Sequence, residues 1–120
     1  MSTKLTVKEI LSAKGKKKLA EVYTHNQLEA EACERAGIDM IISSENNDIQ
    51  SIRDCAKNTF FTVGLSYGKY LNEYEILRRS FSLLENGADA IYCPQSIKLI
   101  KAISDEGIPV IGHTGFIPYK

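Results

Sequence analysis

The sequence predicts an α/β fold of parallel βα repeats, equivalent to about half of a (β/α)8 TIM barrel. Short apolar runs typical of buried strands alternate with helical segments along all 120 residues. A weak repeat, in which a glycine is followed by an apolar residue, Asp or Pro, and an apolar pair, occurs at 37–41, 87–91 and 107–111. The predicted strands start about 20 to 30 residues apart, as expected for consecutive βα units.

Capping residues and glycines set the predicted element boundaries. Thr6 and Glu9 have the spacing of a capping box, so a short helix starts there and ends before Gly15. The glycine of each repeat can take the left-handed turn that ends a helix and leads into a strand. In chain order, the other predicted elements are a strand at 18–23, a helix at 27–36 capped near Asn26, a strand at 39–43 and a helix from Asp48 to about 57. A strand at 59–63, a helix at 73–85 capped by Asn72, a strand at 88–93, a helix at 96–105 and a strand at 109–113 complete the chain.

Residues 1–120 therefore form one partial barrel unit, and its length leaves three arrangements open. Complete barrels take about 250 residues, so five strands and four intervening helices make roughly half of one. A half-barrel leaves two open parallel edges. The chain is a fragment, or pairs with another copy, or closes as a small doubly wound sheet of the flavodoxin type.

Composition excludes several classes of protein. Fifteen basic residues balance fifteen acidic ones, which argues against nucleic acid and anionic membranes as partners. The lysines around Gly15 are interpreted as a solvated turn. No apolar run approaches the ~20 residues of a membrane span. Cys33, Cys55 and Cys93 are odd in number and form no Cys-x-x-Cys pair, which predicts reduced thiols and a cytoplasmic location.

The segments after the strands carry the candidate site residues, because sites in parallel α/β folds form at the carboxyl ends of the strands. Glu45 is followed by Asn46, Asn47 and Asp48, which could hold Mg²⁺ or simply form a polar loop. His113 follows the last strand between glycines, where it could donate a hydrogen bond to a ligand.

Ser66 offers a different hypothesis, a serine hydrolase. The segment 64–68 reads Gly-Leu-Ser-Tyr-Gly and matches the nucleophile-elbow pattern Gly-x-Ser-x-Gly after a predicted strand. His113 follows later in the chain, in the order found in α/β-hydrolases. Six residues separate the serine from the helix cap at Asn72, however, whereas an elbow needs a helix that begins at the serine.

The C-terminal residues contain the most specific motif of the sequence. Gly-Ala-Asp-Ala at 87–90 and Gly-Ile-Pro-Val-Ile-Gly-His-Thr-Gly-Phe-Ile-Pro at 107–118 resemble motifs of the ketopantoate hydroxymethyltransferase family. Weaker similarity occurs at 5–11, 36–39 and 67–70, in the family's order. The resemblance covers essentially the whole chain but only the N-terminal half of such an enzyme.

This resemblance implies a TIM barrel of the phosphoenolpyruvate mutase and isocitrate lyase superfamily. The implied chemistry is Mg²⁺-assisted enolisation of 2-oxoisovalerate. A one-carbon unit then comes from methylenetetrahydrofolate, on the route to pantothenate. The metal would bind the 2-oxo acid and stabilise the enolate charge.

The chain departs from the family pattern at several site positions. Ser44, Glu45 and Asn46 stand where the family has Gly-Asp-Ser, so the resemblance makes Glu45 the metal ligand and Ser44 and Asn46 substrate contacts, with His113. The family's second metal-binding aspartate corresponds to Gly64. Its substrate lysine and a nearby glutamate correspond to Tyr92 and Pro94, and its catalytic glutamate lies beyond residue 120.

Two functions follow from the resemblance and its departures. The first is a divergent or truncated hydroxymethyltransferase relative that acts on a small 2-oxo acid, with its catalytic residues unknown. The second is a non-catalytic half-barrel that binds a 2-oxo acid or forms a homo-oligomer through its open edges.

Overall fold

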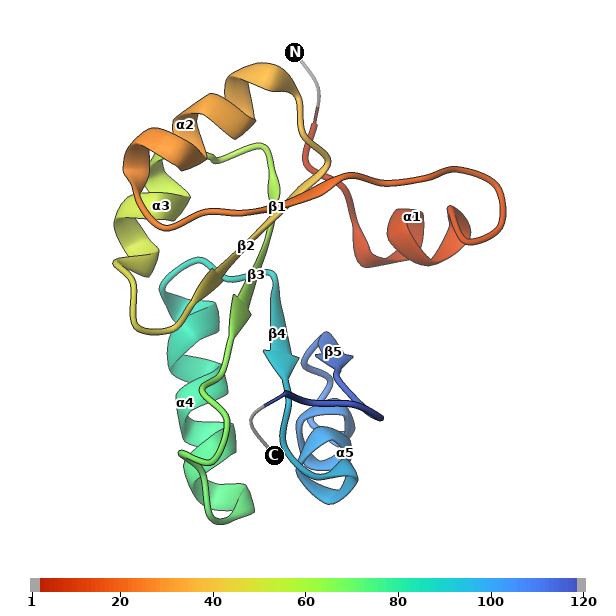
Figure 1. Cartoon of the computed structure of the whole chain (residues 1–120), viewed down its shortest axis with the longest axis vertical. Helices are drawn as coiled ribbons and strands as arrows, with labels where there is room; N and C mark the ends of the chain where they lie inside the picture. The colour runs from red at the N-terminus through yellow and green to blue at the C-terminus, as the bar shows by residue number, and fades with distance from the viewer. Residues whose placement is uncertain (1–2, 119–120) are drawn as a thin grey trace.

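The structure, a computed structural model that describes residues 3–118, is built on a five-stranded parallel sheet (Figure 1). The strands lie in sequential order, and a helix precedes each of them. The elements are α1 (Val7–Ser12), β1 (Glu21–Tyr23), α2 (Gln27–Ala36), β2 (Met40–Ser44), α3 (Ile49–Cys55), β3 (Phe60–Gly64), α4 (Glu73–Glu85), β4 (Ala90–Cys93), α5 (Ile97–Asp105) and β5 (Val110–Gly112). This half-barrel-like arrangement confirms the predicted α/β fold of parallel βα repeats.

Four helix starts follow the predicted caps, and the fifth helix is capped by Ser96, which was predicted as its first residue. A side-chain oxygen accepts a hydrogen bond from the backbone three residues later in every case, and Thr6 with Glu9 forms the complete capping box. The other four caps are Asn26, Asp48, Asn72 and Ser96. Gly37, Gly87 and Gly107 all have positive φ, which confirms that the repeated glycine turns α2, α4 and α5 back toward the strand that follows each of them.

The helices α2 to α5 share one face of the sheet with the main hydrophobic core. Along the strands, buried Ile41, Phe61, Val63, Ile91 and Cys93 belong to the same cluster as side chains of these helices. A sheet with strands in sequential order and its core on one face differs from the doubly wound alternative, in which the strand order reverses and helices cover both faces.

The other face of the sheet would line the interior of a closed barrel. It is buried at the centre, where Phe60 and Ala90 are nearly inaccessible, and open toward both edge strands. Tyr23 of β1 is 45% exposed and Ile111 of β5 is 42% exposed. In the described part of the chain, β1 pairs only with β2 and β5 only with β4, so both outer edges are open.

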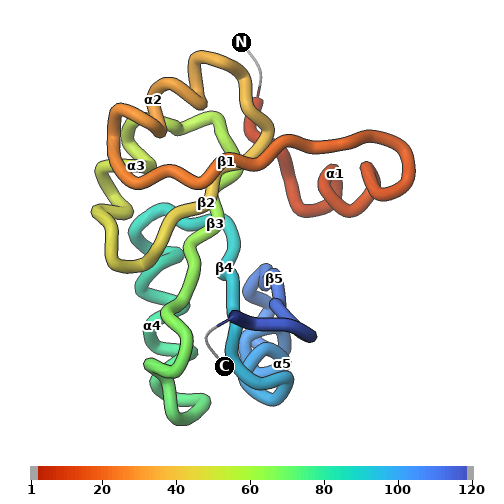
Figure 2. Tube along the Cα trace, in the orientation of Figure 1, coloured from red at the N-terminus to blue at the C-terminus, as the bar shows by residue number. Residues whose placement is uncertain are grey.

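The N-terminal segment differs most from the prediction. The strand expected at 18–23 is only Glu21–Tyr23, and all three residues are exposed because they form an edge strand with one neighbour. Helix α1 buries none of its residues. Figure 2 shows that the chain between α1 and β1 makes a wide loop, which leaves α1 apart from α2 and α3.

An arginine clamp ties α3 to the amino ends of the central strands. Arg53 bonds Asp89 at 2.7 Å, and both side chains are largely buried. Asp89 also accepts a bond from the amide of Phe61 and pairs with Lys4. The remaining donors of Arg53 reach backbone carbonyl oxygens, namely those of Ala56, Lys57, Thr59 and Gly87.

Two further predictions concern the chain as a whole. None of the helices among residues 3–118 has the length and apolar character to cross a membrane. Cys33, Cys55 and Cys93 are free thiols. Burial raises the pKa of the Cys33 and Cys93 thiols, so both are poor nucleophiles.

Candidate functional site

An open hollow of about 420 Å³, here called the strand-end pocket, lies at the carboxyl ends of the strands. Parallel strands bring these ends to one side of the sheet, so residues far apart in sequence meet there. The lining residues are Tyr23, Ile42, Ser43, Ser44, Gly64, Leu65, Ser66, Tyr67 and Tyr92. The pocket combines hydroxyl groups with aliphatic side chains, which suits a small ligand with a polar and an apolar end.

One of the predicted substrate-binding residues, Ser44, lines this pocket, and a second, Asn46, is bonded to two of its lining residues. The hydroxyl of Ser44 accepts a hydrogen bond from the backbone amide of Asn46 at 3.2 Å. The side-chain amide of Asn46 in turn donates to the hydroxyl of Ser66 at 3.2 Å. Ser44, Asn46 and Ser66 thus form a short polar chain that joins the β2 and β3 ends.

Glu45 lies beside Ser44 in sequence but belongs to a different environment. Its side chain is fully buried, and the residue does not line the strand-end pocket. Its Oε1 accepts bonds from the Tyr70 hydroxyl at 2.5 Å and from Arg79 Nε at 2.8 Å. Its Oε2 accepts a bond from the backbone amide of Ser66 at 2.6 Å.

These contacts fix the charge state of the cluster. Burial raises the pKa of the Glu45 carboxyl, but the bonds from Tyr70, Arg79 and Ser66 together outweigh it and hold the pKa below its usual value. Burial and the bond to Glu45 raise the pKa of the Tyr70 hydroxyl. Glu45 and Arg79 are therefore a carboxylate and a guanidinium at neutral pH, and Tyr70 keeps its proton.

The loop 65–72 between β3 and α4 is held by this cluster and by Gln95. Two of its residues, Ser66 and Tyr70, donate to Glu45. Gln95 donates to the carbonyl of Ser66 at 2.7 Å and accepts from the amide of Gly68 at 3.1 Å. Since Leu65, Ser66 and Tyr67 line the strand-end pocket, both anchors shape one of its walls.

His113 is the third predicted substrate contact, and both of its ring nitrogens have partners within the chain. Nε2 lies 2.8 Å from the carbonyl oxygen of Phe116, which can only accept a bond, so Nε2 carries the proton. Nδ1 then accepts a bond from the hydroxyl of Tyr92, at 2.5 Å. Tyr92 lines the strand-end pocket, whereas His113 touches it only through Tyr92.

The residues present do not fit the magnesium ion that the resemblance implies. Mg²⁺ needs octahedral oxygen ligands at about 2.0–2.1 Å, yet both Glu45 oxygens already accept bonds, including one from a cation. The position of the second ligand is Gly64, and the ring of Tyr92 lies 3.3 Å from where its Cβ would be. Within residues 3–118 there is no group of three or more His, Cys, Asp or Glu side chains suited to a metal.

The catalytic arrangement of a serine hydrolase is not assembled around Ser66. Its hydroxyl bonds Asn46, whereas His113 bonds Tyr92 and Phe116. Every described non-glycine residue has negative φ, so the strained elbow is absent, and α4 begins only at Glu73. This geometry gives no support to the hydrolase hypothesis.

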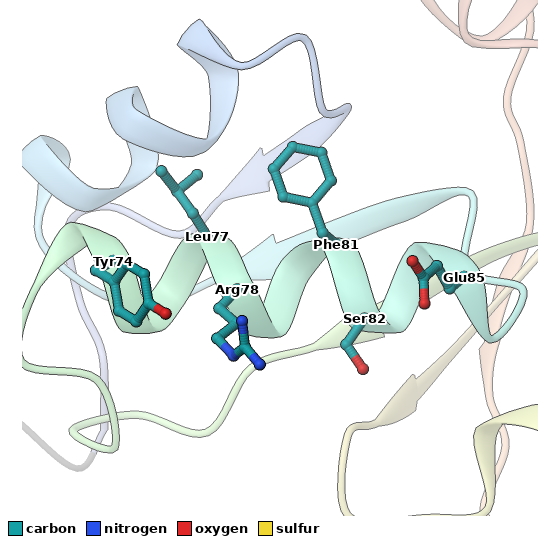
Figure 3. Close-up of a pocket in the computed structure, with 6 residues that line it drawn as sticks. All are labelled: Tyr74, Leu77, Arg78, Phe81, Ser82 and Glu85. Carbon is teal, nitrogen blue, oxygen red and sulfur yellow. The ribbon is translucent and has the colours of Figure 1, made fainter.

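A larger hollow of about 580 Å³ lies along α4 (Figure 3). Its lining residues follow each other at helical spacing on this one helix: Tyr74, Leu77, Arg78, Phe81, Ser82 and Glu85. The groove contains none of the predicted site residues. It is formed by the surface of a single helix, and no residue from a strand end lines it.

Sequence reasoning missed the roles of Tyr70, Arg79 and Gln95. No local pattern links Arg79 to Glu45, which lies 34 positions earlier in the chain. One available signal was the alternation of strand side chains, which places neighbours such as Ser44 and Glu45 on opposite faces where the strand continues. That alternation separates the pocket residue Ser44 from the buried Glu45.

Comparison with known proteins agrees with the resemblance, although no family profile matches the sequence. Curated proteins named 3-methyl-2-oxobutanoate hydroxymethyltransferase from Kosmotoga olearia and Thermosipho africanus are 26% and 29% identical to it. Each alignment covers 95% of this chain and 52% of the relative. The protein of that name from Deinococcus radiodurans is 32% identical over 58% of this chain and 26% of the relative. The chain is thus similar over almost its whole length to the 3-methyl-2-oxobutanoate hydroxymethyltransferases, and it spans about half the length of the curated relatives it matches.

Proposed function

We propose that the strand-end pocket binds a small 2-oxo acid and that the chain provides the N-terminal half of a divergent hydroxymethyltransferase-like site. The observation that carries this proposal is the similarity over 95% of the chain to proteins named for 3-methyl-2-oxobutanoate. The substrate-side positions of the resemblance, Ser44 and Asn46, lie together where parallel α/β folds bind ligands.

The chemistry of the pocket supports a branched 2-oxo acid. Ser44 and Ser66 offer hydroxyl groups to carboxylate and carbonyl oxygens, and Ile42 and Leu65 offer apolar surface to an alkyl end. The Tyr92 hydroxyl donates its one proton to Nδ1 of His113, so His113 fixes the position of the Tyr92 ring in the pocket wall. We therefore assign His113 to the site as a residue that acts through Tyr92.

The resemblance implies that steps after substrate binding need further groups, such as the family's catalytic glutamate, whose position corresponds to none of residues 1–120. One-carbon transfer from methylenetetrahydrofolate and a place in pantothenate synthesis follow from the resemblance to the full-length relatives. The cytoplasmic location stays a prediction from the free thiols.

Binding is tested by titrating the chain with 3-methyl-2-oxobutanoate in calorimetry. 3-Methylbutanoate, which lacks the 2-oxo group, serves as the matched ligand control. We expect saturable binding of the 2-oxo acid that Ser44→Ala weakens about five- to tenfold, the effect of one lost hydrogen bond. Ser82→Ala, in the α4 groove, is the matched control and leaves affinity unchanged. Equal affinity for both acids, or an unaffected Ser44→Ala variant, contradicts the proposal.

We propose self-assembly of a non-catalytic half-barrel as the second candidate. The open edges of β1 and β5, with Tyr23 and Ile111 exposed beside them, support it. Light scattering behind size exclusion should then give an even oligomer that Ile111→Lys dissociates. A folded monomer at all concentrations contradicts this candidate and leaves the binding proposal intact.

A further inference from the structure

Glu45 already has a cation in this fold, the guanidinium of Arg79. Arg79 Nε lies 2.8 Å from Oε1 of Glu45, and Arg79 Nη2 also donates to the backbone carbonyl of Glu45 at 3.2 Å. Lys69 adds a second positive charge 3.7 Å from the same Oε1. The carboxylate is thus neutralised by side chains from the β3–α4 loop and from α4.

Both oxygens of the Glu45 carboxylate also accept bonds from the loop 65–72. The Ser66 amide and the Tyr70 hydroxyl each donate to it at 2.6 Å or less. A divalent cation bound by this carboxylate would compete with these donors and would meet the positive charge of Arg79 at close range.

The direction of the side chain gives an independent argument. Ser44 lines the strand-end pocket, while the adjacent Glu45 is buried away from it beneath the loop 65–72. A metal at Glu45 would therefore not face a ligand in the pocket. Gly64, the corresponding second ligand position, has no side chain to offer, and the ring of Tyr92 fills the space beside it.

We propose that Arg79 takes the place of the divalent cation, so that Glu45 is a positioning residue for the loop 65–72 and the strand-end pocket works without a metal. Two of the residues that line the pocket, Ser66 and Tyr67, lie on this loop, and the Glu45 bond to the Ser66 amide sets where they sit. This inference rests on the proposed 2-oxo acid site, but its test needs no 2-oxo acid.

The metal arm of the test is a titration with Mn²⁺, read as the paramagnetic resonance signal of the free ion. Wild type is compared with Glu45→Gln and with Glu31→Gln, which removes the same charge from an exposed pair with Arg35. We expect the three proteins to give the same free-ion signal up to about 1 mM Mn²⁺. A saturable site in wild type that Glu45→Gln removes and Glu31→Gln keeps overturns the proposal.

The loop arm follows exchange of the Ser66 amide hydrogen by nuclear magnetic resonance. We expect Glu45→Gln and Arg79→Met each to accelerate this exchange about tenfold or more, with no change in Glu31→Gln. An unchanged exchange rate of the Ser66 amide in Glu45→Gln overturns the positioning role. If Glu45→Gln does not fold, the exchange rate in Arg79→Met decides the question in the same way. Failure to bind 3-methyl-2-oxobutanoate would contradict only the proposed function, because neither arm uses that ligand.

Discussion

Replacing Glu45 by Gln tests the energetic weight of the buried cluster. The variant keeps the size of the side chain and one carbonyl oxygen but removes the charge. If that oxygen stays with Tyr70 and Arg79, the new amide group faces the Ser66 amide, and two donors oppose each other.

The expected cost can be worked out from the contacts. Losing a hydrogen bond to a charged group costs about 1.5–3 kcal/mol, and breaking a fully buried ion pair costs about 3–5 kcal/mol. The Arg79 side chain is 32% exposed and keeps part of its hydration, which lowers the second figure. We expect the free energy of unfolding to fall by about 2.5 kcal/mol.

The assay is urea unfolding followed by far-ultraviolet circular dichroism, since the chain has no tryptophan. A loss of this size also lowers the Tm by about 8–15 °C in a domain of this length. The matched control is Glu31→Gln, whose side chain is 46% exposed in its pair with Arg35 and should lose no more than about 0.5 kcal/mol. Equal losses in the two variants would refute the assignment of Glu45 to a buried, charge-paired cluster.

Three further predictions follow from other contacts. Because the pKa of Glu45 is lowered in the fold, its contribution is complete above the unfolded value of about 4.3 and is lost as pH falls through the lower folded value; the stability gap between wild type and Glu45→Gln should therefore shrink below about pH 4, and a constant gap in acid titration would count against it. Arg53→Met should lower the free energy of unfolding by about 3–5 kcal/mol, since it leaves Asp89 and four carbonyl groups without this donor, and a loss below about 1 kcal/mol in urea would contradict this. Nitrogen-15 spectra should show His113 as the Nε2–H tautomer near pH 8, with Tyr92→Phe mixing the two tautomers; a protonated Nδ1 in wild type would disprove the assigned bond.

Most of the fold could be predicted because its signals are local. Helix caps and the glycines after the helices act within a few residues, and four of the five capped helix starts were correctly placed. The first strand was predicted three residues too long at its start, because the run at 18–20 has strand character but no second neighbouring strand to extend the pairing.

The candidate site was harder to predict because its chemistry depends on distant partners. The predicted substrate contacts after β2 lie near each other in the fold, since Ser44 lines the strand-end pocket and Asn46 donates to Ser66 in its wall, and their role in binding stays a prediction. The character of Glu45 depends instead on Arg79, and a carboxylate with a buried guanidinium partner behaves unlike one open to a cation. Composition and spacing do not distinguish these two cases, whereas the packing of α4 against the strand ends does.

The number of strands bears on the proposed self-assembly but not on the proposed ligand site. The full-length relatives are TIM-barrel enzymes, and such a barrel closes with eight strands. Two copies of this chain would bring five plus five strands, two more than that closure allows. Assembly through β1 and β5 would therefore build an interior unlike that of the relatives. Because the strand-end pocket is lined by β1 to β4 and the β3–α4 loop of one chain, the proposed ligand site does not depend on such an assembly.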